Sequence, residues 1–89
     1  MNNNERVLVV CAVRDELTGR FLNPQYFEKT EEAIRWFKFV LNDTPMWRAN
    51  AAMYSLYDLG IFGEKSGYTS KTPEMIQGGQ SVLERSDNG

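Results

Sequence analysis

The chain has 89 residues, of which 42% are hydrophobic and 25% are charged, and its formal net charge at pH 7 is −2. These are ordinary values for one globular domain with a modest core, so they argue against a disordered chain. The slightly acidic balance argues against a protein that holds nucleic acid by bulk positive charge, although it leaves room for a local basic patch.

The sequence has one cysteine and no histidine. An internal disulfide therefore cannot form, and a metal site made of histidine or cysteine is not expected. We expect no cofactor, no metal and a reducing cytoplasm as the compartment. Because the first residues are polar and no apolar run approaches about 18 residues, we also expect a soluble protein without a membrane partner.

The first predicted element is a strand at Arg6 to Arg14, a segment rich in β-branched residues. Alternation gives it two apolar faces, with Val7, Val9, Cys11 and Val13 on one and Leu8, Val10 and Ala12 on the other. A strand with two apolar faces is expected to be central and covered on both sides. The chain offers one convincing helix, so we predict that a second copy covers the other face in a homodimer.

A hairpin is predicted next. Asp15 can bond its own backbone and Gly19 supplies a positive φ in the turn, after which the chain returns as a strand at Arg20 to Leu22. Asn23 to Phe27 should break this strand and lead into a helix, where one of the two aromatic residues could pack over the first turn.

The strongest helix signal runs from Thr30 to Asn42. Thr30 is expected to cap its start, and the proline at position 45 to stop it. The predicted buried stripe consists of Ala33, Phe37, Val40 and Leu41, widened by Ile34 and Trp36. Phe39 falls on the polar side, where it is either a boundary contact shielded by a loop or part of a second surface.

Pro45 to Asn50 is expected to be a loop, in which Trp47 either plugs the end of the core or lies exposed. A strand should follow at Ala52 to Phe62, in which Gly60 marks either a bulge or a close backbone contact. Its two predicted faces are Tyr54, Leu56 and Asp58 against Ser55, Tyr57, Leu59 and Ile61. Gly63 to Gly67 is predicted to be the turn of a second hairpin.

The predicted fold is therefore a two-layer α+β domain over residues 5–70. An antiparallel sheet of three to four strands, in the order β-β-α-β-(β), packs against one helix. Residues 71–89 are rich in glycine and polar residues and should form a mostly flexible tail, held at most through Met75 and Ile76.

Catalytic chemistry has little support in this sequence, and we expect no enzyme. Without histidine a nucleophile lacks its commonest base, and Cys11 lies in an apolar strand where a thiolate is disfavoured. Asp15 and Glu16 are adjacent carboxylates, but the turn alone accounts for Asp15.

Planar side chains beside cations are the ingredients for binding nucleic acid, because bases stack on rings while Arg and Lys contact phosphates. Three such clusters are present: Arg14 with Arg20 and Phe21, Arg35 with Lys38 and Phe39, and Trp47 with Arg48. Each has a simpler explanation, since Arg35 can pair with the glutamate four residues before it and hairpin arginines often only solvate a sheet edge.

Five segments carry a family resemblance: Ala12 to Phe21, Glu32 to Phe37, Leu41 to Asp43, Tyr54 to Phe62 and Pro73 to Ile76. In order and spacing they resemble the small nonstructural protein of gokushovirus-type microviruses, which are single-stranded DNA phages of bacteria. The resemblance implies a phage protein of the host bacterial cytoplasm, absent from the capsid, that binds single-stranded DNA or assists viral DNA synthesis. It brings no catalytic residues.

The positions that match the family and could touch DNA are Arg14, Arg20, Phe21 and Arg35. With the other two clusters, the candidate nucleic-acid-binding residues are Arg14, Arg20, Phe21, Arg35, Lys38, Trp47 and Arg48. The first interpretation is a homodimeric accessory protein that binds single-stranded DNA. The alternative is a non-catalytic interaction module that binds a phage or host protein.

Overall fold

The structure is a computed structural model that describes residues 5–85. Its elements are β1 (Val7–Asp15), β2 (Arg20–Phe21), β3 (Gln25–Phe27), α1 (Thr30–Asp43), α2 (Pro45–Ala49), a 3-10 turn (Ala51–Met53), β4 (Tyr54–Gly63), β5 (Gly67–Gly78) and α3 (Gly79–Val82). The mixed class and the antiparallel sheet are confirmed, but the described part has five strands and three α-helices, where three to four strands and one helix were predicted. None of the helices between residues 5 and 85 is long and apolar enough to cross a membrane.

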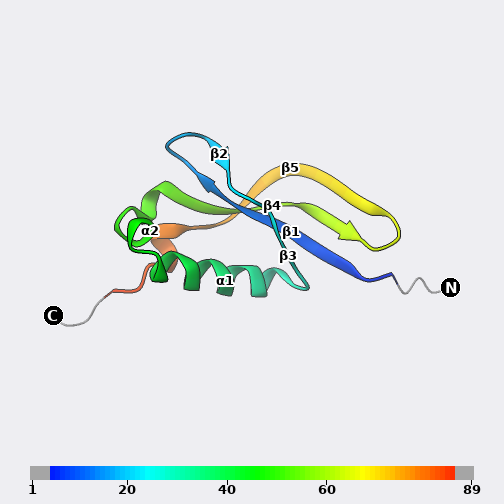
Figure 1. Cartoon of the computed structure of the whole chain (residues 1–89), viewed down its shortest axis with the longest axis horizontal. Coiled ribbons are helices and arrows are strands. Elements are labelled where there is room, and N and C mark those ends of the chain that lie inside the picture. Colours follow the sequence, from blue (N-terminus) through cyan, green and yellow to red (C-terminus); the bar gives the residue numbers. More distant parts are fainter. Residues whose placement is uncertain (1–4, 86–89) are drawn as a thin grey trace.

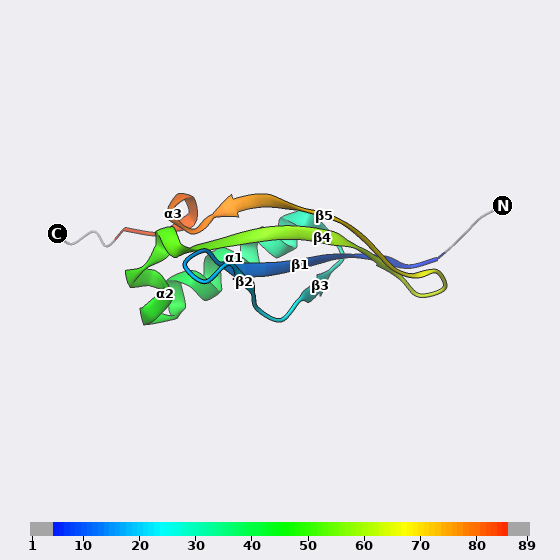
Figure 2. The same ribbon diagram turned by 90° about the horizontal axis from the view of Figure 1, so that it is seen from above.

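Strand β1 is central, as predicted. It pairs with β4 along one edge and with the short strands β2 and β3 along the other, and β5 pairs with the far edge of β4. All pairs are antiparallel. Helix α1 runs below the sheet in Figure 1, and the view from above in Figure 2 shows strands lying in front of it.

The core forms between α1 and one face of the sheet. Phe37 and Leu41 of α1 are fully buried together with Cys11, Val13 and Leu56 of the strands. Burying each large apolar side chain stabilises the fold by about 1.5–3 kcal/mol, so the packing of α1 on the sheet contributes much of the stability of the domain. The predicted helix stripe is thus confirmed at its centre, whereas Val40 at its margin is only half-buried.

The ends of α1 differ in detail from the sequence prediction. Lys29, not Thr30, is the N-cap residue, and no side chain caps the helix. Glu32 in the first turn instead accepts a hydrogen bond from the backbone N–H of Glu28, which ties the chain before the helix to its first turn. After α1 ends, Pro45 starts α2 rather than a loop, because proline at the first helical position has its φ already set for a helix.

Strand β3 was missed by sequence reasoning because three residues behind a proline are too few to show an alternating pattern. Its register places Tyr26 opposite Val10 and Phe27 opposite Val9. Phe27 therefore faces α1, where its ring lies 5.6 Å from that of Trp36. It is the aromatic residue that packs against the helix.

Of the two alternatives predicted for Gly60, the bulge is confirmed, and it changes which side chains face α1. Val10 pairs with Gly60 but Cys11 pairs with Asp58, so Leu59 is an extra residue in β4. Beyond the bulge the alternation is inverted. Ile61 pairs with Val9 and lies on the α1 side, so its predicted face was wrong.

Regular structure continues past Lys71, where a flexible tail was predicted to begin. Strand β5 runs to Gly78, and α3 then buries Val82 against the core. The sequence concealed this strand because β5 lies at the sheet edge and most of its side chains are exposed, which leaves it with a polar composition. The last four residues of the predicted tail, 86–89, lie outside the described residues.

Candidate functional site

The side of the sheet opposite α1 carries a group of aromatic side chains. Because Cys11 and Val13 face α1, alternation turns Leu8, Val10, Ala12 and Arg14 to the other side. Cross-strand partners share a face, so the partners of these residues point the same way. These partners are Phe21, Tyr26, Tyr57 and Phe62, and Tyr68 and Met75 follow as partners of Phe62 and Tyr57. We call Arg14, Phe21, Tyr26, Tyr57, Phe62, Tyr68 and Met75 the aromatic face.

Two ring pairs of the aromatic face span β1. The rings of Phe21 and Tyr57 meet edge to face at 5.3 Å, and those of Tyr26 and Phe62 at 5.7 Å. In each pair one ring comes from the β2–β3 edge of β1 and the other from β4, so the rings meet over the central strand. On this side of β1, Val10 and Ala12 are accordingly buried, at 2% and 0% exposure, while Leu8 is half-buried.

This burial removes the reason given above for a homodimer. The second apolar face of β1 is covered by rings of the same chain, so no partner is needed to bury it. The homodimer itself stays a prediction.

Several rings of the aromatic face remain accessible. Phe21 is 36% exposed, and Tyr26 and Tyr68 are each 52% exposed. The Tyr68 hydroxyl donates a hydrogen bond to the Leu59 carbonyl at 3.0 Å, which fixes its ring against the bulge. The aromatic face thus contains half-buried rings, Tyr57 and Phe62, beside exposed rings that solvent can reach.

Arg14 lies among these rings at the β1–β2 end. Its guanidinium carbon is 5.5 Å from the centroid of Phe21 and 5.7 Å from that of Tyr57, distances at which a cation is attracted to a ring. Arg14 Nε lies 3.4 Å from Glu16 Oε1, while the Tyr57 hydroxyl donates a hydrogen bond to Glu16 Oε2 at 2.9 Å. Desolvation and this hydrogen bond raise the pKa of Tyr57. The carboxylate thus compensates the positive charge of Arg14.

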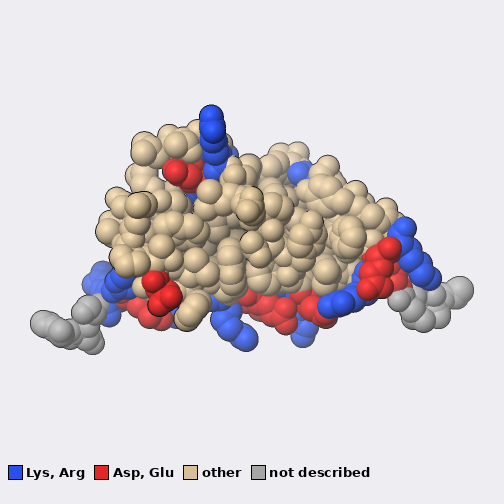
Figure 3. All heavy atoms as spheres, in the orientation of Figure 1, with Lys and Arg blue, Asp and Glu red and all other residues tan. Residues whose placement is uncertain are grey.

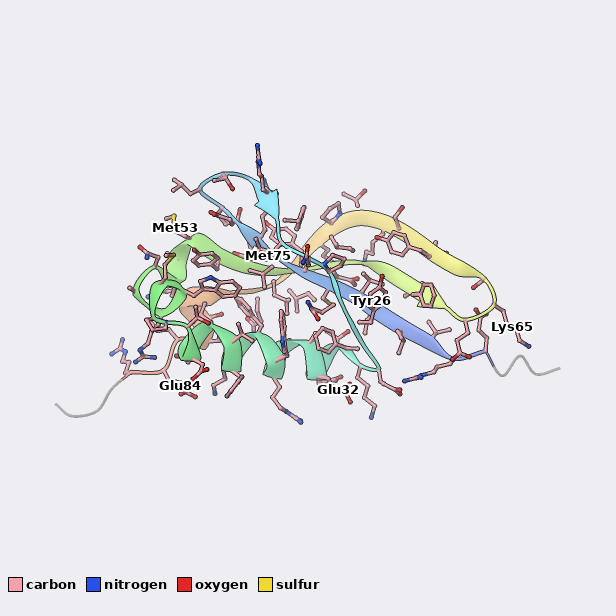
Figure 4. All side chains as sticks on the ribbon, viewed as in Figure 1. Tyr26, Glu32, Met53, Lys65, Met75 and Glu84 are labelled. Atoms are coloured by element: carbon pink, nitrogen blue, oxygen red, sulfur yellow. The ribbon has the colours of Figure 1, made fainter. Side chains whose placement is uncertain are left out.

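Charged side chains gather elsewhere on the molecule. In Figure 3 the Lys, Arg, Asp and Glu side chains lie mainly along the lower side, where α1 runs, and at the hairpin end of the sheet. Figure 4 shows the labelled Glu32 and Glu84 on the α1 side and Lys65 at the tip of the β4–β5 hairpin. Most of the upper side in Figure 3 is uncharged, apart from a few groups near the β1–β2 hairpin and one basic group farther along, toward β5.

The candidate residues from the first hairpin lie close together in the structure. Arg14 and Phe21 are cross-strand partners and share the aromatic face. Arg20 is exposed and pairs with Asp15, which places it on the opposite side of the hairpin from Phe21.

The helix candidates form a separate surface. Arg35 and Lys38 are exposed on the solvent side of α1, where they border a shallow depression of about 360 Å³. Phe39 also lines it and is 66% exposed, so the expectation that a loop shields this ring was wrong. Lys38 Nζ lies 3.5 Å from a Glu84 carboxylate oxygen. The sheet separates this surface from the aromatic face.

Trp47 and Arg48 have local contacts at the far end of the core. The Trp47 ring stacks on Tyr54 at 4.8 Å with an interplanar angle of 15° and packs against the core, as the plug interpretation expects. Arg48 donates hydrogen bonds to the Asn42 side chain and to the Glu84 carbonyl. It therefore holds the chain after α3 against the end of α1.

Cys11 is the one cysteine of the chain and is fully buried. Burial, with a smaller contribution from Asp58, raises the pKa of its thiol to about 11. A thiol in this state is a poor nucleophile at neutral pH. Within residues 5–85, no three His, Cys, Asp or Glu side chains converge in a way that could hold a metal ion.

Sequence reasoning missed most of the aromatic face, namely Tyr26, Tyr57, Phe62, Tyr68 and Met75, together with Glu16. Tyr26 and Tyr68 lie in strands that were unrecognised or thought shorter. The face on which Phe62 lies could have been predicted, because a bulge at Gly60 inverts the alternation of side chains beyond it. Tyr57 was placed correctly on the face away from Leu56 but was not connected with Phe21.

Together these features define a small α+β protein whose antiparallel sheet is covered by a helix on one side and presents aromatic rings on the other. No curated protein and no solved structure matches the chain. The family model described as Phage ORF5 protein matches residues 8–82. The chain belongs to this family and is a phage protein.

Proposed function

We propose that this chain is a nonstructural accessory protein of a gokushovirus-type microvirus, and that it binds single-stranded DNA on its aromatic face in the cytoplasm of the host bacterium. The observation that carries this proposal is the set of five rings on the side of the sheet away from α1. Unpaired bases stack on such rings, and each stacked base contributes about 1–3 kcal/mol without requiring a particular sequence.

The spacing of the rings supports a strand lying along the sheet. The register places Phe21 beside Arg14 of β1 and Phe62 beside Leu8, so these two rings lie six residues apart along β1. At about 3.3 Å per residue this separation is roughly 20 Å. Tyr57 and Tyr26 lie at the intermediate rows, beside Ala12 and Val10. Successive bases of an extended strand can therefore meet successive rings.

Single strands are favoured over duplex by the chemistry of this face. Bases in a duplex are stacked on one another and present only their edges in the grooves. Proteins that hold duplex DNA depend on many contacts from Lys and Arg to phosphates. A neutral aromatic surface in a chain of net charge −2 is suited instead to unpaired bases. Such binding would assist DNA synthesis by keeping the viral strand unpaired, and it assigns no catalytic role to the chain.

The test is a fluorescence anisotropy titration of labelled single-stranded DNA with the parent and three variants. Phe21→Leu and Tyr26→Leu remove a ring while keeping an apolar side chain over β1, and each should weaken binding roughly 5- to 150-fold. Phe39→Leu is the matched control, because it removes an exposed ring from the opposite side of the molecule. If only Phe39→Leu weakens binding, DNA lies on the α1 surface with Arg35 and Lys38 instead.

A second candidate function is a protein-interaction module for a phage or host protein. It is favoured by the composition of the aromatic face, since the cores of protein interfaces are enriched in Tyr, Phe, Met and Arg and depleted of other charged residues. Tyr26 and Met75 are 52% and 53% exposed there. If the parent retains no single-stranded DNA at low salt and high protein concentration, this second function replaces the first.

We also propose that the protein acts as a homodimer. Sedimentation equilibrium should then report about twice the chain mass of 10.2 kDa. A mass that stays at the monomer value over the concentration range in which DNA binds would exclude the dimer and leave the DNA proposal unaffected.

A further inference from the structure

The charges around the aromatic face indicate how DNA would be bound there. This inference rests on the proposed function. We infer that this chain holds single-stranded DNA through the faces of its unpaired bases, with at most one phosphate contact per chain, and that Glu16 limits that contact. The ligand is then defined by its bases, and a strand that lacks them should not bind.

The first observation is the scarcity of cations on the aromatic face. Among residues 5–85 the register places one cation there, Arg14, beside five rings. Lys71, although it lies in β5, bonds the carboxylates of Asp58 and Glu74. Asp58 is the partner of Cys11, so this ionic group lies on the α1 side of the sheet.

Other cations are held away from the face by their own contacts. Arg48 donates to groups at the end of α1, and Arg6 pairs with Glu28. Arg35 and Lys38 lie on the solvent side of α1. Arg20 precedes Phe21 in β2, but its pairing with Asp15 directs it to the opposite side of the hairpin. Among the described residues, the register therefore leaves Arg14 as the cation on the aromatic face itself.

The second observation concerns the state of that cation. The guanidinium of Arg14 lies within cation–π distance of both Phe21 and Tyr57, and Glu16 Oε1 is 3.4 Å from its Nε. Arg14 Nε is buried and has no hydrogen-bond acceptor among the described residues, because the Glu16 contact is an ion pair without hydrogen-bond geometry. Glu16 is itself fixed by the Tyr57 hydroxyl. A phosphate approaching Arg14 must therefore compete with a carboxylate that is already in position.

These two observations set the salt dependence. Each phosphate neutralised in a single strand changes the slope of log K against log salt by about −0.7. With Arg14 compensated, the parent should show a slope between zero and about −0.7. Glu16→Gln removes the competing charge and can still accept the Tyr57 hydrogen bond through its amide oxygen. We expect this variant to steepen the slope by about 0.7 and to bind more tightly at low salt.

The deciding experiment compares a short oligothymidine with an abasic strand of the same length and phosphate count, using the parent protein over a range of salt. Loss of stacking on even one ring corresponds to roughly a 5- to 150-fold weaker affinity, so the abasic strand should bind at least that much more weakly. Because this comparison needs no substitution, it does not depend on the folding of any variant. Equal affinity for the two strands, or a slope of about −1.4 or steeper, would overturn the inference.

The Glu16→Gln titration is the second arm, with circular dichroism to establish that the variant is folded. An unchanged slope would show that Glu16 does not restrain Arg14, and would overturn that part of the inference. If the parent does not bind oligothymidine at any salt concentration, the proposed function itself is refuted. If it binds both strands equally, only the inference about the binding mode is refuted.

Discussion

Replacing Gly60 by alanine should be severely destabilising, because this glycine forms the bulge that turns Phe62 and its partner Tyr68 onto the aromatic face. Its φ is +137°, a region that residues with a Cβ rarely adopt. A Cβ built there would lie 2.2 Å from the Thr69 carbonyl oxygen and 3.0 Å from the Ser70 Cα. Both obstacles are backbone atoms, so no side chain can rotate to make room.

The magnitude follows from these two effects. Backbone strain in such a conformation costs about 1–3 kcal/mol. Moving β5 away from β4 at this row also weakens ladder hydrogen bonds, each with a net contribution of about 0.5–1.5 kcal/mol. The expected loss is therefore about 2–5 kcal/mol. A domain of this length has a free energy of unfolding of roughly 4–13 kcal/mol, so the variant should lose a large part of its stability.

The assay is urea denaturation followed by circular dichroism, with Gly78→Ala as the matched control. Gly78 has a φ of −88°, and a Cβ there would meet nothing within 4 Å. The control should be unchanged or stabilised by up to about 1 kcal/mol, because alanine restricts the unfolded chain. Coincident curves for the two variants would refute the bulge and, with it, the placement of Phe62 and Tyr68.

Three further outcomes can be checked on the same protein. Phe37→Ala should reduce the free energy of unfolding by about 3–5 kcal/mol, since the ring is fully buried, whereas Phe39→Ala on the exposed side should change it by less than about 0.5 kcal/mol in the same urea titration. A thiol reagent at neutral pH should label Cys11 only after denaturant is added, because burial protects the thiol and raises its pKa to about 11; rapid labelling of the native protein would contradict this. The pKa of Glu5 is lowered by hydrogen bonds from the backbone and hydroxyl of Ser66 and from the backbone of Lys65, so its stabilising contribution is present above the ordinary carboxyl pKa and is lost as pH falls through the lowered value. The difference in Tm between parent and Glu5→Gln should accordingly vanish in acid, and a difference that persists would argue against the contact.

Sequence reasoning succeeded where one physical signal dominates a segment. The buried stripe of α1 has helical spacing around Phe37, and β1 carries β-branched residues on both faces, so both elements and the centre of the core could be predicted. The two glycine turns were also found, because Gly19 and Gly67 adopt the positive φ that their positions require.

The remaining features depend on contacts between distant parts of the chain. Strand β3 exists because it pairs with β1, and β5 because it pairs with β4, while neither has a strong pattern of its own. The homodimer argument failed for a related reason. The sequence shows that Val10 and Ala12 need cover, but only the register shows that rings from β2, β3 and β4 provide it.

The candidate site was partly predictable. Arg14 and Phe21 were chosen for their proximity across a hairpin, and the structure places them in contact. Lys38 was chosen for composition and Arg35 for composition and the family resemblance, and both lie on another surface. Composition identifies residues able to bind DNA, but only the strand register decides which of them share a face.

The most direct test of the central claim is an NMR titration of the protein with a short oligothymidine, observing the aromatic ring signals. We expect the rings of Phe21, Tyr26 and Tyr68 to shift together as DNA is added, because stacked bases change the magnetic environment of those rings. The ring of Phe39, on the opposite side of the molecule, should stay unchanged. Shifts confined to Phe39 and its neighbours on α1, or no shift in any ring, would contradict DNA binding at the aromatic face.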